Sequence, residues 1–352
     1  MTYTSTGSPG SIGGATRSYM GSDDGMKTLA TLLLLLIPSL VLAEDPLPSW
    51  NEGPAKQSII DFVEKVTDKN SDSYVPIYDR VAVFDNDGTL WCEAPLPMQV
   101  YYVLAELKIK VAQDPTLAEK PMVKAALAGD FEKLLQGTHY DGLVEIIGLT
   151  HAGMTTTEYD AAVKAWVKTF RHPRFDRTLA GMTYQPMQEL LRYLRANDFQ
   201  TFIVSGGGAD FMRVFAYRIY GIPTNQIVGT NTLTKFELVD GKPVLMKTME
   251  HMFVDDKAGK PVGIHQFIGR RPIAAFGNSD GDQQMLEYTT IDNPYPSFGL
   301  LVHHTDAKRA YAYDSHPPSS GKLVTALEAA PKYGWTVVSM KDDWKTIFFG
   351  SE

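Results

Sequence analysis

The sequence is poor in cysteine, in basic tracts and in long apolar runs, and each absence excludes a class of protein. Cys92 is the only cysteine among 352 residues, so no intramolecular disulfide can form. With no histidine near it, this thiol is expected to pack in the core and not to act as a nucleophile. Lys and Arg number 33 against 41 Asp and Glu, which gives a formal net charge of −8. Because no basic tract interrupts this balance, a nucleic-acid partner is not expected.

The longest apolar run covers residues 28–43, contains Pro38 and is shorter than the ~20 residues that a membrane-spanning helix needs. A basic residue before the run and small residues at its end are typical of a secretory signal peptide, about residues 26–43. A membrane anchor is the alternative, but no stable anchor is expected. Residues 1–25, rich in Gly, Ser and Thr, are expected to form a disordered leader, and Met26 is a candidate start. The predicted location is periplasmic or secreted, and the lack of disulfides favours a Gram-negative periplasm.

An α/β pattern surrounds a long helical block. Residues 81–84 are consecutive apolar residues that predict a buried strand. Residues 93–184 instead carry apolar residues at three- and four-residue intervals with no strand pattern, as expected for an inserted helical subdomain. The sequence therefore predicts an α/β fold with a Rossmann-like parallel sheet core, formed by residues 44–92 and 185–352. Alternating residues on both sides of Asp240 and its following glycine also predict a hairpin.

Three predicted strands end in polar residues that suit a ligand site. Residues 85–89 (Asp-Asn-Asp-Gly-Thr) follow the first strand, residues 205–208 (Ser-Gly-Gly-Gly) a second, and residues 277–282 (Gly-Asn-Ser-Asp-Gly-Asp) a third. Lys260, at the start of a predicted helix, lies between the second and third runs. Open α/β folds bind their ligands at the carboxyl ends of parallel strands, so these residues are expected to share one cleft.

Taken in this order, the four motifs resemble those of the haloacid dehalogenase-like (HAD) hydrolases. The resemblance covers residues 81 to about 290 and places the helical insertion where that family carries its cap. The spacing is most similar to the phosphoserine-phosphatase-like branch. The resemblance implies an HAD-type phosphatase that hydrolyses small organic phosphate monoesters with Mg²⁺, through an aspartyl-phosphate intermediate. Asp87, two residues after the nucleophile, marks phosphatases within the family, since dehalogenases lack that acid.

The resemblance also implies a role for each motif residue, and simple chemistry is compatible with these roles. Asp85 would be the nucleophile, and Asp87 would protonate the leaving alcohol and later deprotonate water, which requires a raised pKa. Lys260 would offset the charge of Asp85 and of the phosphoryl group. The predicted phosphate and substrate ligands are Thr89, Ser205, Gly206 and Glu93, the last of which would meet a substrate amine. Mg²⁺ prefers oxygen ligands, and those predicted are Asp85, the backbone carbonyl of Asp87, Asn278 and Asp282.

Some alternatives stay open. Asn278 departs from the commoner Gly-Asp form, so Asp280 also qualifies as a metal ligand, and Lys257 could replace Lys260. A calcium loop is excluded, because Leu90 stands where such a loop needs glycine. A phosphotransferase that uses the same phospho-aspartate, or a non-catalytic binding protein of this fold, is also compatible with the sequence. The natural substrate, the oligomeric state and the role of the last 40 residues are not predicted.

Overall fold

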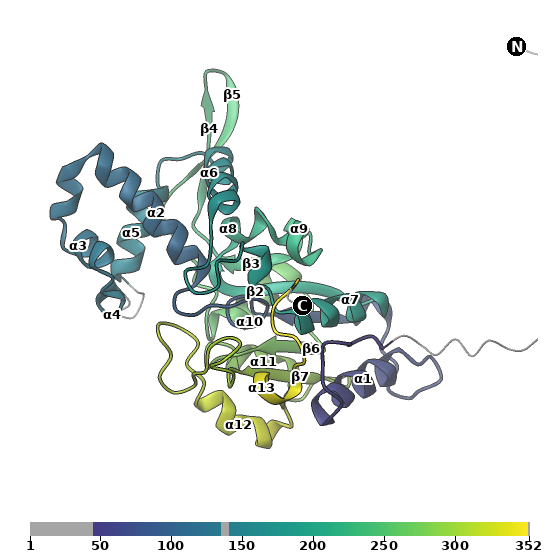
Figure 1. Cartoon of the computed structure of the whole chain (residues 1–352). Helices are drawn as coiled ribbons and strands as arrows, with labels where there is room; N and C mark the ends of the chain where they lie inside the picture. The colour runs from purple at the N-terminus through teal and green to yellow at the C-terminus, as the bar shows by residue number, and fades with distance from the viewer. Residues whose placement is uncertain (1–44, 135–140, 351–352) are drawn as a thin grey trace, which may run out of the picture. The chain divides into compact units, whose positions relative to one another are not determined.

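The computed structural model describes residues 45–134 and 141–350 (Figure 1). The predicted leader and signal peptide lie outside the described residues. The described residues belong to one compact unit. No helix within the described ranges combines the length and the apolar character needed to cross a membrane.

A six-stranded sheet forms the core, in the order β3-β2-β1-β6-β7-β8, and every neighbouring pair is parallel. Its strands are β1 (Val81–Phe84), β2 (Gln200–Gly208), β3 (Ile227–Thr230), β6 (Ala274–Gly277), β7 (Phe298–His303) and β8 (Thr336–Ser339). The predicted Rossmann-like parallel sheet is confirmed, and β1 has the predicted bounds. Because β1 lies at the centre of the sheet, its carboxyl end has strands on both sides.

Both faces of the sheet are buried under apolar side chains. Ala82 and Phe84 belong to one hydrophobic cluster and Val81 and Val83 to the other, because alternate residues of a strand point to opposite faces. The first cluster is completed by α1 (Pro54–Thr67), α7 (Gln185–Ala196), α8 (Ala209–Arg213), α9 (Ala216–Tyr220) and α13 (Met340–Asp343). The second is completed by α11 (Gln283–Thr290) and α12 (Thr325–Tyr333). The run of apolar residues in β1 is thus the signature of a strand buried on both faces.

Only helices occur between β1 and β2 in the part of the chain that the structure describes. Those that precede α7 are α2 (Met98–Gln113), α3 (Pro121–Ala128), α4 (Phe131–Leu134), α5 (Asp141–His151) and α6 (Thr156–Thr169), with short 3-10 helices at Pro115–Glu119 and Ala180–Met182. α3 and α4 are separate helices, although only two residues lie between them. Gly129 ends α3 in the left-handed conformation, with φ of 75°, which explains the break. α8 and α9 are likewise separate, and Phe215, with φ of −127°, lies at the break between them.

The predicted hairpin is present as β4 (Thr234–Val239) and β5 (Lys242–Lys247). Asp240 and Gly241 form its two-residue turn, with φ of 51° and 74°, the signs that a type I′ turn requires. The hairpin does not join the main sheet. It contacts α6, and Met246 forms a bridge to Thr155 just before that helix. In space, therefore, the hairpin extends the helical insertion, as Figure 1 shows.

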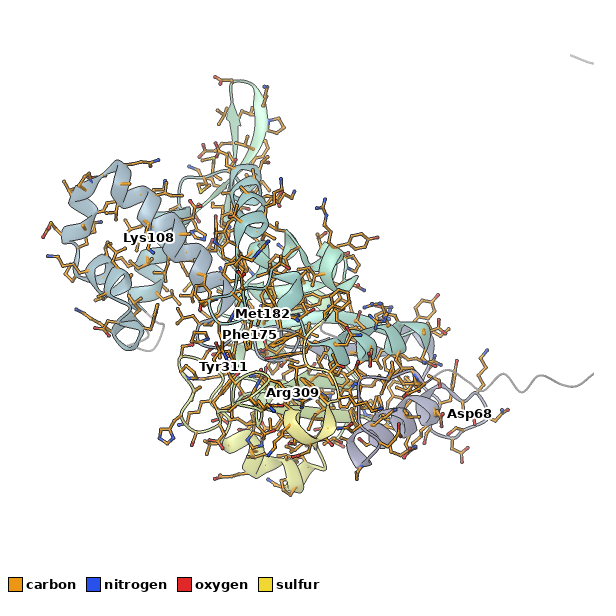
Figure 2. The ribbon with its side chains drawn as sticks, viewed as in Figure 1. Asp68, Lys108, Phe175, Met182, Arg309 and Tyr311 are labelled. Atoms are coloured by element: carbon orange, nitrogen blue, oxygen red, sulfur yellow. The ribbon has the colours of Figure 1, made fainter. Side chains whose placement is uncertain are left out.

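The segment that leads from the helical insertion back to the core packs against the C-terminal part of the chain. Phe175 and Tyr311 contact each other edge to face at 5.8 Å, and the guanidinium of Arg174 lies 4.6 Å from the centre of the Tyr311 ring. Arg309 donates to the carbonyl of Trp344 at 3.0 Å. Figure 2 shows Phe175, Tyr311 and Arg309 in this region. The C-terminal residues thus hold the end of the insertion as well as adding β8 to the sheet.

Candidate active site

Asp85 and Asp87 follow the central strand β1 at the carboxyl edge of the sheet. The N–H of Asp85 donates to the carbonyl of Phe276 on β6 at 2.9 Å, which extends the sheet ladder by one residue. The chain then turns at Gly88, whose φ is +76°. A Cβ atom at Gly88 would lie 2.1 Å from Nδ2 of Asn278, so only glycine fits this position. The turn leaves both carboxylates in the wall of one cavity.

Lys260, in the short helix α10 (Gly259–Gly263), joins two sides of the site. Its Nζ donates to Oδ1 of Asp85 at 2.7 Å, to Oδ1 of Asp282 at 2.6 Å and to the carbonyl of Val204 at 3.0 Å. Burial alone would lower the pKa of Lys260, but the carboxylates of Asp282 and Asp85 outweigh burial and raise it. Lys260 is therefore a fixed cation beside the predicted nucleophile. The alternative, Lys257, makes neither of these ion pairs.

Asp282, a predicted metal ligand, does not line the cavity. While its Oδ1 accepts from Lys260, its Oδ2 accepts from the N–H groups of Asn278 at 2.9 Å and Ser279 at 3.0 Å. The side chain is fully buried. These contacts make Asp282 a positioning residue that holds the lysine and shapes the loop of residues 277–282. Direct metal binding by Asp282 stays a prediction.

Asn278 is fixed by hydrogen bonds at both ends of its side-chain amide. Its Oδ1 accepts from the hydroxyl of Thr89 at 2.9 Å, and its Nδ2 donates to Oε1 of Glu93 at 2.8 Å. Thr89 is fully buried and does not line the cavity, so it supports Asn278 instead of lying where a phosphate ligand would. An amide oxygen has two lone pairs, which leaves one on Oδ1 for a metal.

Glu93 is buried in a network that the sequence did not predict. Besides Asn278, its carboxylate accepts from the hydroxyl of Tyr313 at 2.8 Å and from that of Ser320 at 2.6 Å. Burial raises the pKa of Glu93 to about 7, although these hydrogen bonds oppose the rise. Glu93 lines the cavity, but its oxygens already accept from three donors. Its contacts connect Asn278 with Tyr313 and Ser320 of the C-terminal segment. A contact between Glu93 and a substrate amine stays a prediction.

The C-terminal segment forms one wall of the cavity. Ser320 reaches Glu93 across 227 positions of sequence. Asp280 accepts from the backbone N–H groups of Val324 at 2.8 Å and Ala326 at 3.0 Å, where α12 begins. These bonds hold Ser319, Ser320, Gly321 and Lys322 against the cavity. The segment for which the sequence predicted no role is thus part of the site, and Asp280 anchors it.

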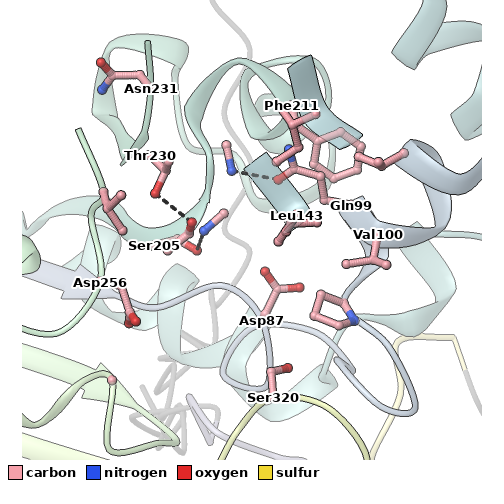
Figure 3. A pocket seen from close by; sticks show the side chains of 18 of the residues that line it. Asp87, Gln99, Val100, Leu143, Ser205, Phe211, Thr230, Asn231, Asp256 and Ser320 are labelled. Carbon is pink, nitrogen blue, oxygen red and sulfur yellow. Dashed lines mark hydrogen bonds between the residues drawn. The ribbon is translucent and has the colours of Figure 1, made fainter. Parts of the chain in front are cut away.

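Asp87 projects into the cavity between Ser205 and Ser320 in the view of Figure 3. Its Oδ1 accepts from the indole N–H of Trp91 at 2.9 Å. Burial raises the pKa of Asp87, which is the direction that a general acid needs. Ser205 and Gly206 line the same cavity, as the order of the motifs predicted. Their loop is irregular, because β2 shifts its register against β3 between residues 205 and 208.

The cavity has a volume of about 630 Å³, and its acidic end holds one carboxylate that the sequence did not predict. Asp256 lines the cavity and is labelled in Figure 3. A Cβ atom at Gly281 would lie 2.6 Å from Oδ1 of Asp256, so this carboxylate faces the loop of residues 277–282. Burial raises its pKa. No spacing pattern marks Asp256, since it stands in an irregular segment before α10.

Oxygen donors suitable for a divalent cation lie in and beside this end of the cavity. Asp85 and Asp87 line its wall, whereas Asn278 does not line it and is buried against the turn at Gly88. Within residues 45–134 and 141–350, no three His, Cys, Asp or Glu side chains are grouped as in a metal site. Mg²⁺ needs fewer, since it keeps several waters and takes one or two carboxylates. The carboxylate of Asp85, the carbonyl of Asp87 and the amide oxygen of Asn278 are all hard oxygen donors. This donor set fits Mg²⁺.

Solved structures with a similar arrangement share little sequence with this chain. A functionally unknown protein from Anaerococcus prevotii is 16% identical, with a TM-score of 0.52, over 84% of this chain and 94% of its own. A phosphoserine phosphohydrolase-like protein from Francisella tularensis is also 16% identical, with a TM-score of 0.39, over 71% of this chain and 98% of its own. Phosphoserine phosphatase from T. onnurineus is 16% identical, with a TM-score of 0.33, over 72% of this chain and 92% of its own. At these identities the likeness concerns the fold alone.

No curated protein sequence matches the chain. The family model of haloacid dehalogenase-like hydrolases, in contrast, matches residues 82–287, which is more than half of the chain. The match begins in β1 and ends in α11, so it includes all four motifs and the helical insertion. The order of motifs, the parallel sheet and this match agree, and the chain belongs to the haloacid dehalogenase-like hydrolase family.

Proposed function

We propose that this hydrolase is an exported, Mg²⁺-dependent phosphatase that acts on small organic phosphate monoesters through a phospho-aspartate at Asp85. One arrangement supports this more than any other: Asp85, paired with Lys260 at 2.7 Å, shares a cavity with a second acid, Asp87. A carboxylate that attacks a phosphate dianion needs positive charge beside it, and Lys260 supplies that charge. The second acid is what a phosphatase of this family needs and a dehalogenase lacks.

The proposed reaction has two steps, in which Asp85 and Asp87 have different roles. First, an oxygen of Asp85 bonds to phosphorus while the bond from phosphorus to the ester oxygen breaks, and Asp87 gives its proton to the leaving alcohol. Next, water attacks the same phosphorus, Asp87 takes a proton from that water, and the bond to Asp85 breaks. Inorganic phosphate leaves, Asp85 is again a free carboxylate, and Asp87 is again protonated. Ser205 and the backbone N–H groups of its loop would bind the phosphoryl oxygens.

Mg²⁺ would offset the charge on the phosphoryl group and orient it for in-line attack. Asp85, the backbone carbonyl of Asp87 and Asn278 would hold it. Thr89 and Glu93 would act through Asn278, because their hydrogen bonds fix the direction of its amide. In this arrangement Asp282 would act through Lys260 and not through the metal.

Export to the periplasm is proposed from residues 26–43, which have the pattern of a signal peptide. The single cysteine is compatible with an oxidising compartment, since no wrong disulfide can form within the chain. Cell fractionation tests this proposal: the full chain should be found in the periplasm, and a chain without residues 26–43 should stay in the cytoplasm. An unchanged location after the deletion would contradict export by this segment.

The proposed activity is tested with the purified protein and p-nitrophenyl phosphate. Phosphate should be released with Mg²⁺, release should stop with EDTA, and excess Mg²⁺ should restore it. Activity that persists with EDTA would contradict the proposed metal requirement. Failure to release phosphate from any monoester at any Mg²⁺ concentration would contradict the phosphatase itself.

A further inference from the structure

The hairpin of β4 and β5, labelled in Figure 1, carries an apolar face that is open to solvent. Alternate residues of a strand share a face, and the register of the hairpin places Phe236 opposite Leu245 and Leu238 opposite Pro243 on one of them. Phe236 is 63% exposed, Leu238 65% and Leu245 45%. A two-stranded sheet alone is marginally stable and usually needs a third strand or a packed face. These side chains are thus typical of a sheet with more than two strands.

The backbone hydrogen bonds of Lys247 show which groups of the hairpin point outward. Its N–H donates to the carbonyl of Met154 at 2.8 Å, and its carbonyl accepts from the N–H of Gly153 at 3.1 Å. Lys247 therefore directs both groups away from β4. In an antiparallel pair, opposite residues that bond to each other alternate with opposite residues that both point away. Since Thr234 lies opposite Lys247, Thr234 and every second residue after it direct their N–H and C=O groups to the outer edge of β4.

The outer edge of β5 is closed to a further strand. One end of it bonds to residues 153–155 of the helical insertion. Further along, Pro243 has no N–H group, and the alternation places the missing donor on the outer side. β4 has no such protection, because it contains no proline and makes no backbone hydrogen bond beyond the hairpin to any residue that the structure describes. A further strand can therefore pair with the outer edge of β4.

The charges of β4 favour a second copy of the same strand as the partner. In a symmetric antiparallel pair of β4 strands, the residue on the two-fold axis lies opposite its own copy. An axis at Lys235 or at Glu237 would place like charges directly opposite each other, which destabilises a sheet. An axis at Phe236 instead places Lys235 of each copy opposite Glu237 of the other. Axes nearer the ends of β4 would pair fewer residues.

The two charged side chains are already neighbours within one chain. Nζ of Lys235 lies 3.3 Å from Oε1 of Glu237, and the lysine side chain is 71% exposed. With the axis at Phe236, the charges of both copies would form a cluster of four in which each charge has neighbours of opposite sign. Opposite charges that lie across from each other stabilise paired strands.

We propose that two copies of this chain associate through the outer edges of β4, about a two-fold axis at Phe236, and form one four-stranded antiparallel sheet with β5 at each edge. Thr234, Phe236 and Leu238 would exchange backbone hydrogen bonds with the second copy. The apolar faces of the two hairpins would join, with the two Phe236 side chains adjacent. Because β4 has six residues, the interface is small and the dimer should depend on concentration. This inference does not depend on the proposed phosphatase activity.

Charge-reversal variants test the pairing, with sedimentation velocity over a wide range of protein concentrations as the measurement. We expect the wild type to be monomeric at low concentration and dimeric at high concentration. Lys235→Glu would place a carboxylate opposite Glu237 of the second copy, so the dissociation constant should rise at least about tenfold. Combining Lys235→Glu with Glu237→Lys exchanges the charges and should restore the wild-type value. Lys242→Glu is the matched control, because it makes the same change of net charge at an exposed residue of β5, and it should leave the dissociation constant nearly unchanged.

A proline on β4 tests the backbone hydrogen bonds. Leu238 directs its N–H outward, so Leu238→Pro removes a donor to the second copy and none from the ladder with β5. The dimer should be lost, while the melting temperature of the monomer should stay close to that of the wild type. Leu238→Ala loses the same apolar side chain but keeps the N–H, so it should weaken the dimer much less.

A wild type that stays monomeric at every concentration would overturn the proposal. A dimer would also overturn it if Lys235→Glu left the dissociation constant unchanged, or if the exchange of both charges failed to restore it, because such a dimer uses another surface. The charge variants provide this test even where Leu238→Pro disturbs the hairpin. Phosphate release is a separate measurement, so a protein that forms this dimer and hydrolyses no ester would contradict the proposed function alone.

Discussion

Asn278 donates its side-chain amide to Glu93 at 2.8 Å, and this bond joins two segments that are 185 residues apart in the sequence. This hydrogen bond accounts for asparagine at position 278, where the commoner motif has aspartate. An aspartate at position 278 would place a second carboxylate against the buried Glu93 with no proton between them. Asparagine avoids that repulsion and still offers an oxygen to a metal.

Asn278→Asp should therefore destabilise the protein at high pH. At pH 8, above the pKa of about 7 that burial gives Glu93, both carboxylates would be charged. We expect the free energy of unfolding to fall by about 1–3 kcal/mol in urea denaturation. At pH 6 Glu93 is mostly protonated and can donate to the new aspartate, so the loss should shrink. Adding Glu93→Gln should restore part of the stability at pH 8, and a single variant as stable there as the wild type would contradict this account.

Removal of the cation from the buried carboxylates should be costly. Lys260→Met leaves Asp85 and Asp282 buried without their partner, which should lower the free energy of unfolding by about 3–5 kcal/mol and abolish turnover. Lys257→Met is the matched control, since this lysine lines the cavity and makes neither ion pair. Its stability should stay within about 0.5 kcal/mol of the wild type. Similar losses for the two variants would argue against a special role for Lys260.

Asp87→Asn should slow the enzyme according to the leaving group. Poor leaving groups such as alkyl alcohols need a proton when the ester bond breaks, whereas p-nitrophenolate does not. We expect kcat/KM to fall about 10²–10⁴-fold for alkyl esters and much less for p-nitrophenyl phosphate. Hydrolysis of the phospho-aspartate should also slow, which pre-steady-state kinetics would reveal as a burst. A uniform loss over all esters would contradict the role of Asp87 as the acid.

His304 should make the fold sensitive to acid. Its Nε2 lies 2.9 Å from the carbonyl of Gly88, and burial lowers its pKa to about 3. In the unfolded chain this histidine has an ordinary pKa of about 6.5 and binds a proton at pH values where the folded chain does not. The free energy of unfolding therefore falls as the pH drops from 6.5 toward 3. This one group should account for about 2 kcal/mol between pH 6.5 and 5. The pH dependence of the free energy of unfolding of His304→Gln, compared with that of the wild type, isolates this contribution, and parallel curves would contradict it.

Local sequence patterns were enough to predict most of the fold and the central residues of the candidate site. Four apolar residues before Asp85 predict a strand buried on both faces, and the polar runs after three strands predict where Asp85, Asp87 and Ser205 meet. These predictions work because the parallel sheet itself brings its strand ends together. Lys260 was predicted from its place between two motifs, and its ion pairs with Asp85 and Asp282 favour it over Lys257.

Contacts between distant segments could not be predicted in the same way. Tyr313 and Ser320 donate hydrogen bonds to Glu93, from which they are 220 and 227 positions away in the sequence. A single hydroxyl residue in a loop has no sequence pattern that predicts such a partner. Thr89 follows the acidic motif directly, yet the turn at Gly88 directs it to Asn278 and away from the cavity. The hairpin was predicted from its turn, but its association with α6 depends on tertiary packing alone.

The central claim is a covalent phospho-Asp85, and rapid acid quench followed by peptide mass spectrometry tests it most directly. The enzyme is mixed with excess p-nitrophenyl phosphate and Mg²⁺ and quenched within milliseconds, with Asp87→Asn used to slow hydrolysis of the intermediate. We predict one added phosphoryl group on the peptide that contains Asp85, and none in Asp85→Asn, which should also be inactive. Phosphate release at full rate by Asp85→Asn, or a phosphoryl group on another residue, would contradict the account.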